Sequence, residues 1–231
     1  MTNRLPLKML AGLRRNPSAS LLAVQLAGVL AYPLMEDTVA GRALFGVLGI
    51  AVLALALRVV NRSPALNWVA WLLAVPAVVL SLIAGLTPYV GANPYAQLFE
   101  GALYLYTAAG LIGYMLRDHR VSLDELYAVG ATFTLLAWAF AYAYSVCQHW
   151  YPESFTAIAN ASEPRTWLEL LYLSFSVLSG VGLSDIMPVK PQARALVMLE
   201  QFAGVMYIAL VVSRLIGLAT SRAIAARSAD K

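Results

Sequence analysis

The sequence WLELLYLSFSVLSGVGLSD, which covers residues 167–185, decides how this chain is organised. Its first part, Trp167–Val177, is an apolar run of 11 residues. A helix needs about 20 residues to cross a bilayer, so this run is too short to span one. The small residues that follow do not continue a helix readily in an apolar setting. We therefore expect the run to be re-entrant or to lie at the membrane interface.

The chain as a whole has the composition of a membrane protein. Of its 231 residues, 61% are hydrophobic and 12% are charged, whereas soluble domains carry about 25% charged residues. This composition excludes a soluble enzyme and a disordered tail. The apolar residues form runs that are long enough to cross a membrane. The six predicted spans are Ser18–Met35, Ala43–Val60, Ala65–Leu86, Tyr95–Leu116, Leu126–Val146 and Ala195–Leu218.

The fold class that follows is an all-α polytopic membrane protein. It has six transmembrane helices, with a re-entrant helix and loop between the fifth and the sixth. The single cysteine, Cys147, excludes a disulfide within the chain and a multi-cysteine metal site. No serine–histidine–aspartate grouping, paired-histidine motif or phosphate-binding glycine loop is present, so we expect neither an enzyme nor a cofactor.

The distribution of basic residues predicts the orientation. With the N-terminus inside, 12 lysines and arginines lie on the cytoplasmic side and 4 lie outside. We therefore expect a multi-pass protein of the plasma membrane with both termini in the cytoplasm. The net charge of +4 reflects this topology, and no nucleic-acid partner is expected. A cleaved signal peptide is the alternative for the first span, but its apolar run is longer than a typical signal sequence has.

The short apolar run has the features of a capped helix followed by an ion-binding loop. Ser162 suits an N-cap and Pro164 is tolerated in a first turn, so the helix is expected to open at Ser162–Pro164. It ends at Ser179, where the small residues begin. A helix aimed into the membrane places its negative end at mid-depth, and the extended segment after it can turn carbonyl oxygens toward a cation.

This arrangement resembles the pore of the tetrameric potassium channels. Their pore has a short helix, then threonine-threonine-valine-glycine-tyrosine-glycine-aspartate, then a proline and an inner helix with a hinge glycine. Pro188 follows the loop here, and Gly204 lies twenty residues beyond Ser184, where those channels commonly place the hinge. The corresponding filter residues are Ser179, Gly180, Val181, Gly182, Leu183, Ser184 and Asp185.

The resemblance implies a domain organisation and a partner. Residues 1–17 are a cytoplasmic segment, 18–116 a four-helix membrane region, 117–125 a cytoplasmic linker, 126–218 the pore domain and 219–231 a cytoplasmic tail. One filter segment per chain cannot surround an ion, so four copies are needed. The expected partners are a homotetramer and membrane lipid. Potassium or sodium is the expected permeant ion, held by the backbone carbonyls of Gly180–Leu183, and no small-molecule substrate is expected.

Three departures from the potassium-channel pattern affect selectivity. Gly180 replaces the threonine that lines the innermost ion site, and Leu183 replaces the tyrosine that braces the filter. Ser184 replaces the second glycine, and a positive φ at this position would strain a serine by about 1 kcal/mol. Discrimination between potassium and sodium is therefore expected to be weaker than with the full motif. Asp185 either gathers cations as a ring of four or caps the turn.

The sixth span is expected to contain a hinge and a gate. Gly204 is placed to act as the hinge, although a small residue also serves close helix packing. On a helical period of 3.6, Val205, Ile208, Val212 and Ile216 form one apolar stripe. Four copies of this stripe can close a pore by dewetting. The alternative is that the stripe faces lipid or the core.

Three glutamates lie in or near apolar spans, where an unpaired charge is costly. Glu169 is expected to stabilise the positive end of the short helix. The resemblance implies that Glu200 packs behind the filter, hydrogen-bonded to it, rather than lining the pore. Glu100 has no partner that the sequence identifies, and it is the only ionisable residue in the fourth span. That span lacks the arginine series of a voltage sensor, so voltage gating is not expected.

Two classes of function remain. The first is a homotetrameric cation channel. The second is a non-conducting or regulatory protein with the same pore fold, whose altered filter no longer coordinates ions. A secondary transporter is disfavoured because the chain lacks paired broken helices in two repeated halves.

Overall fold

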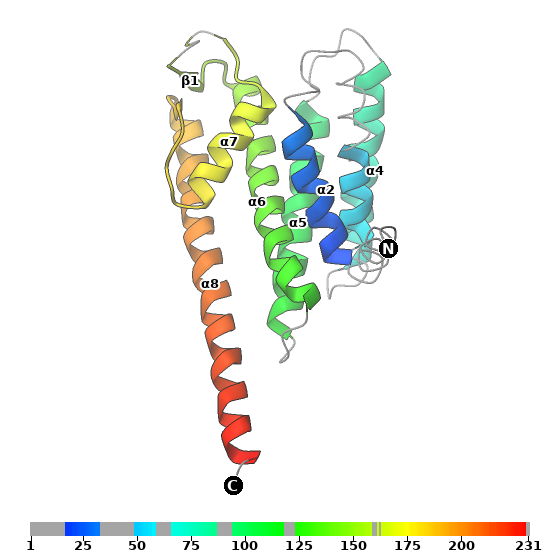
Figure 1. Cartoon of the computed structure of the whole chain (residues 1–231). Helices are drawn as coiled ribbons and strands as arrows, with labels where there is room; N and C mark the ends of the chain where they lie inside the picture. Colours follow the sequence, from blue (N-terminus) through cyan, green and yellow to red (C-terminus); the bar gives the residue numbers. More distant parts are fainter. Residues whose placement is uncertain are drawn as a thin grey trace, which may run out of the picture.

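The computed structural model describes residues 17–32, 49–58, 66–86, 94–117, 123–158, 161 and 163–229 (Figure 1). Nearly all of this part of the chain is helical. The helices are α2 (Pro17–Ala31), Gly49–Arg58, α4 (Asn67–Leu86), α5 (Pro94–Arg117), α6 (Leu123–Trp150), α7 (Trp167–Leu178) and α8 (Pro191–Ala229). Two short strands, β1 (Phe155–Ala157) and β2 (Ile186–Pro188), complete the described elements.

Two helices are long and apolar enough to cross a membrane, over Asp124–Trp150 and Pro191–Arg214. These residues contain the fifth predicted span and most of the sixth. Helices also cover parts of the other four predicted spans, but the prediction that all six cross the membrane stays a prediction. Arg14, Arg15 and Arg42, which are among the basic residues counted for the orientation, lie outside the described residues.

Helix α6 lies at the centre of the bundle (Figure 1). It contacts α5 and α2 on one side and α7 and α8 on the other, while α4 packs against α5. The large buried side chains at the α5–α6 contact include Tyr104, Trp138 and Leu135. Glu100, for which the sequence identifies no partner, accepts a hydrogen bond of 2.6 Å from Ser81 Oγ and so joins α5 to α4.

Helix α7 begins later than the sequence analysis expected. Thr166, not Ser162, is its N-cap, and Pro164 lies before the helix. The Thr166 side chain accepts a hydrogen bond from Glu169 N at 3.3 Å, and Thr166 N donates to Glu169 Oε2 at 2.6 Å. This reciprocal capping box satisfies two N–H groups that a helix start otherwise leaves unpaired. The expected role of Glu169 at the positive end of the helix agrees with this contact.

The strands form a small antiparallel pair that the sequence analysis did not anticipate. Phe155 pairs with Pro188 and Ala157 with Ile186. Just outside the pair, Val189 N donates to Ser154 O at 2.8 Å. Because β1 precedes α7 and β2 follows the loop after α7, the pairing brings the two ends of this segment together.

Several helices extend past the predicted boundaries. Helix α6 starts at Leu123, so residues 123–125 of the expected linker are helical. Helix α8 continues to Ala229, beyond the expected end of the sixth span at Leu218, and projects past the other helices (Figure 1).

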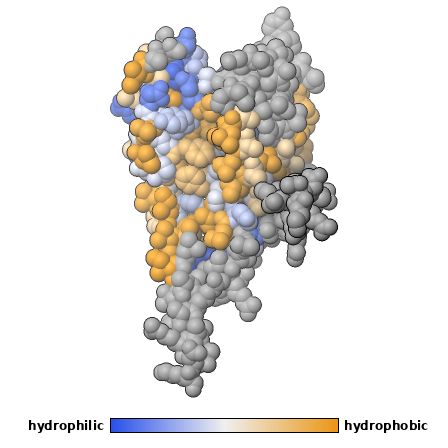
Figure 2. All heavy atoms as spheres, viewed as in Figure 1, coloured by the Kyte–Doolittle hydropathy of each residue, from blue (hydrophilic) through white to orange (hydrophobic). Residues whose placement is uncertain are grey.

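Apolar side chains cover much of the described surface (Figure 2). Along α8, the exposed large apolar residues are Met198, Leu199, Phe202, Val205, Met206, Ile208, Val212 and Ile216. A continuous exposed apolar face of this kind needs lipid or another protein chain to cover it.

Candidate functional site

The segment that follows α7 is a tight turn built around two glycines. Gly180 has a φ of +74° and Gly182 a φ of +70°. Residues with a side chain rarely adopt this left-handed region, so both positions favour glycine. Backbone hydrogen bonds tie the turn to the end of the helix: Gly180 N donates to Val177 O at 3.0 Å and Gly182 N to Ser176 O at 3.1 Å.

Ser184 does not carry the strain that the sequence analysis considered for it. Among the described residues, Glu153 is the one non-glycine residue with a positive φ, and Ser184 is not. Instead, Ser184 Oγ accepts a hydrogen bond of 3.1 Å from Ile186 N, which leads the chain into β2. The positive φ values therefore lie at Gly180 and Gly182, and serine is compatible with the local turn.

The segment is open on one side. Val181 and Leu183 are 70% and 69% exposed, and Gly180, Gly182 and Asp185 are exposed as well. Asp185 makes no hydrogen bond or ion pair with the residues that the structure describes, so the structure offers no support for its role as a turn cap. Since a single chain leaves these backbone groups uncovered, the segment is available to line a space shared with other chains.

Glu200, on α8, connects α8 to α6 and α7 through buried hydrogen bonds. Its carboxylate is fully buried and accepts hydrogen bonds from the hydroxyls of Tyr144 on α6 and Ser174 on α7. Ser174 Oγ also lies 2.8 Å from Ala137 O. Glu200 therefore does not face a lumen. Its hydrogen-bond partners lie on α6 and α7 and not in the loop. This corrects the expectation that Glu200 hydrogen-bonds to the filter itself.

Gly204 is the point at which α8 crosses the end of α7. A Cβ atom added to Gly204 would lie 2.1 Å from the carbonyl oxygen of Leu178, far inside any normal contact distance. The absence of a side chain thus permits the two helices to touch just before the loop begins. The contact matches the alternative of close packing, and α8 passes through Gly204 without interruption, so the hinge stays a prediction.

The predicted gate stripe is exposed in the single chain. Val205 and Ile216 are 64% and 61% exposed. Ile208 and Val212 line an apolar groove of about 490 Å³, with residues of α2, α6 and α7 on its other walls. The stripe is therefore not part of the buried core of one chain, and whether it lines a pore stays a prediction.

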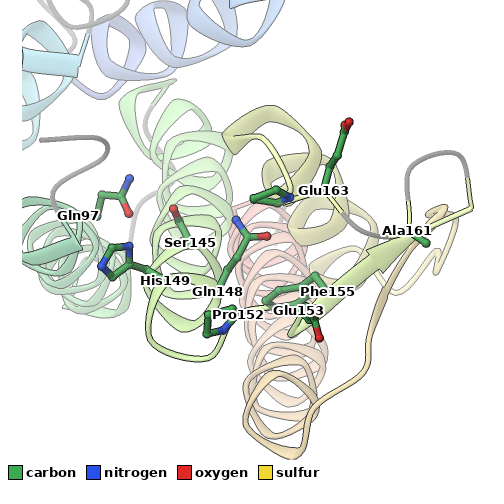
Figure 3. Close-up of a pocket in the computed structure, with 10 residues that line it drawn as sticks. Gln97, Ser145, Gln148, His149, Pro152, Glu153, Phe155, Ala161 and Glu163 are labelled. Carbon is green, nitrogen blue, oxygen red and sulfur yellow. The ribbon is translucent and has the colours of Figure 1, made fainter. Parts of the chain in front are cut away.

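A cavity of about 410 Å³, lined by both polar and apolar side chains, lies between the end of α6 and the chain that leads into α7 (Figure 3). Gln148, on its wall, holds Arg165 by both main-chain groups: its Nε2 donates to Arg165 O at 3.0 Å, and its Oε1 accepts from Arg165 N at 2.7 Å. His149 and Gln97 line the same cavity. No group of three or more metal-ligating side chains occurs among the described residues. The two hydrogen bonds of Gln148 thus position the chain that leads into α7.

Residues 127–221 match a protein family described as "Ion channel". The match begins in α6 and covers both strands, α7, the glycine turn and most of α8. No curated protein and no solved structure matches the chain. The match supports an ion channel rather than an enzyme, and together with the apolar helices it supports a membrane protein.

Proposed function

We propose that this protein is a passive, potassium-channel-like cation channel. In this proposal, Gly180–Ser184 of four identical chains form the filter, and backbone carbonyls coordinate potassium or sodium. One observation carries it: a short capped helix ends in an exposed turn with two positive-φ glycines, within the region that matches the ion channel family. At the two glycines of this turn, no side chain covers the exposed main-chain groups.

The requirement for several chains follows from exposure. A carbonyl-lined site needs oxygens on all sides of the ion, and one chain supplies them from one side only. The exposed apolar face of α8 offers a surface for association of identical chains around an axis. We propose a homotetramer in the plasma membrane, with both termini in the cytoplasm.

Ion flux from liposomes tests this function. The purified chain is reconstituted and its conductance is compared for potassium, sodium and a large organic cation. We expect both small ions to pass, with weak discrimination between them. Absence of flux from a correctly assembled protein would favour the second candidate, a non-conducting pore-fold protein. That candidate draws on the departures at Gly180, Leu183 and Ser184. Mild cross-linking that yields only monomers or dimers would contradict the tetramer.

Restoring the potassium-channel residues in the proposed filter is expected to change the ion selectivity. Replacing Leu183→Tyr and Ser184→Gly together is expected to raise the potassium-to-sodium flux ratio. Adding Gly180→Thr should raise it further, but at a cost in stability of about 1–3 kcal/mol, because threonine does not suit the φ of +74°. Flux ratios and thermal unfolding of both variants are measured. Ratios identical to that of the original protein would mean that the filter lies elsewhere.

The apolar stripe of α8 leads to a prediction about leak. A polar residue in a dewetted constriction stabilises water and ions there, so Val212→Ser or Ile216→Ser should raise the resting flux. Leu199→Ser is the control, because Leu199 is similarly exposed on α8 but lies about 120° around the helix from Val205 of the stripe. If both stripe variants assemble normally and their flux stays at the level of the control, the gate is not at this stripe.

A further inference from the structure

An ion pair joins the start of α6 to the inner part of α8, which is the part that runs from Gly204 toward the C-terminus. Arg214 Nη2 lies 2.7 Å from Glu125 Oε1, and the two side chains are only 15% and 5% exposed. Glu125 belongs to the first turn of α6, and Arg214 lies on α8 between Val212 and Ile216 of the predicted gate stripe. A largely buried pair is screened little by water, so its geometry matters to the position of both helices.

The residue before Glu125 makes a second connection. Asp124 accepts hydrogen bonds from the N–H and the hydroxyl of Ser18, at 3.3 Å and 3.1 Å, and so holds the start of α2. The first turn of α6 thus binds α2 with one carboxylate and α8 with the next. The position of the inner part of α8 is therefore linked, through α6, to the N-terminal helix.

Helix α8 is held by two groups of contacts, one on each side of the Gly204 contact. The outer part of α8, which precedes Gly204, is fixed to α7 and α6 by Glu200. The inner part is fixed to α6 by Tyr207, whose hydroxyl donates to Val129 O at 2.6 Å, and by Arg214. Movement of the inner part alone therefore has to act against the contacts of Tyr207 and Arg214.

Arg214 lies far enough along α8 from Gly204 for a small bend at Gly204 to displace it from Glu125. Ten helical residues correspond to about 15 Å along the axis. A bend of about 20° at Gly204 would therefore move Arg214 by about 5 Å, which is more than an ion pair tolerates. The pair that forms in the present conformation of α8 would therefore be broken by a bend of this size away from α6.

We propose that the Glu125–Arg214 pair is a latch that holds the gate in its unbent, non-conducting position. This inference rests on the proposed channel function. Opening separates the two side chains as the inner part of α8 moves away from α6. Glu125 and Arg214 act as positioning residues, because neither needs to touch the permeating ion.

Charge neutralisation and exchange test the latch in the full-length protein in liposomes. Glu125→Gln and Arg214→Gln are each expected to raise the resting potassium flux about threefold to tenfold, without changing the potassium-to-sodium ratio. The exchange Glu125→Arg with Arg214→Glu restores the pair with reversed polarity and should return the flux toward the original level. Ser213→Ala, which removes only a hydroxyl bonded within α8, is the matched control.

Each outcome has a definite meaning. No flux from the original protein and none from either neutral variant, with assembly intact, would refute the channel function itself. Flux from the original protein that is unchanged in both neutral variants would overturn the latch. Raised flux that the exchange variant does not reduce would show that the two charges act separately and would also overturn it. Arg214→Lys keeps the charge at this site, so a low flux in this variant and a raised flux in Arg214→Gln would support the latch even if the exchange variant failed to assemble.

Discussion

Replacing Gly204 with alanine is expected to abolish most of the conductance and to lower the stability of the assembled protein. The added Cβ would lie 2.1 Å from Leu178 O, and both atoms belong to the backbone or are rigidly attached to it. The helices α7 and α8 must then separate by about 1 Å or more to restore normal contact. Such overpacking typically costs about 1–3 kcal/mol. Because Leu178 is followed by the glycine turn, the displacement reaches the proposed filter directly.

Gly217→Ala provides the control for this prediction. Gly217 lies on the same helix, but a Cβ at this position meets no atom within 4 Å among the described residues. Alanine favours a helix over glycine by about 1 kcal/mol, so this variant should be neutral or slightly more stable. Thermal unfolding and potassium flux of both variants are compared. A Gly204→Ala protein that is as stable and as conductive as Gly217→Ala would refute the tight contact between α7 and α8.

Removing the carboxylate of Glu200 is the second change for which we expect a large effect. In Glu200→Leu, the Tyr144 hydroxyl loses its acceptor in a fully buried position, while Ser174 retains Ala137 O nearby. An orphaned buried hydroxyl costs about 1–3 kcal/mol. We expect a lower unfolding temperature and reduced flux, because α7 loses the hydrogen bond that joins Ser174 to α8. Glu200→Gln retains an acceptor oxygen and should be affected less.

A second substitution separates this hydrogen bond from the loss of charge. Removing both partners of a buried hydrogen bond is often nearly neutral, whereas removing one is not. Tyr144→Phe in the Glu200→Leu background should therefore recover part of the lost stability. If Tyr144→Phe destabilises the original protein and the Glu200→Leu variant equally, the two side chains are not coupled, and the role assigned to Glu200 is wrong.

The end of α7 could be predicted from the sequence, but its start could not. The small residues from Ser179 onward predicted the end that α7 has at Leu178, whereas the helix was expected to open at Ser162–Pro164 and begins at Trp167. Ser162 and Thr166 are both good N-cap residues. The decisive signal was Thr166 followed three residues later by Glu169, the sequence pattern of a capping box.

The surroundings of the candidate site depend on contacts between distant residues. Tyr144, Ser174 and Glu200 come from three helices, and no local pattern marks them as partners. The ion pair of Glu125 with Arg214 joins residues 89 positions apart. The spacing of Gly204 from the filter singled it out, but its contact with Leu178 depends on the direction in which α7 is aimed. Helical periodicity identifies faces, and only the packed structure determines which faces meet.

The β1–β2 pair makes the region between the strands a replaceable unit. Phe155–Pro188 and Ala157–Ile186 pairing fixes both ends of residues 158–185 to each other. Main-chain hydrogen bonds of this kind depend little on the side chains between the ends. A cassette that contains the short helix and glycine turn of another channel, inserted between the two strands, would therefore find its ends already held at the correct separation. A graft of this one contiguous segment would then test the proposed filter, provided that the grafted helix keeps the serine that meets Glu200 and the close approach of its end to Gly204.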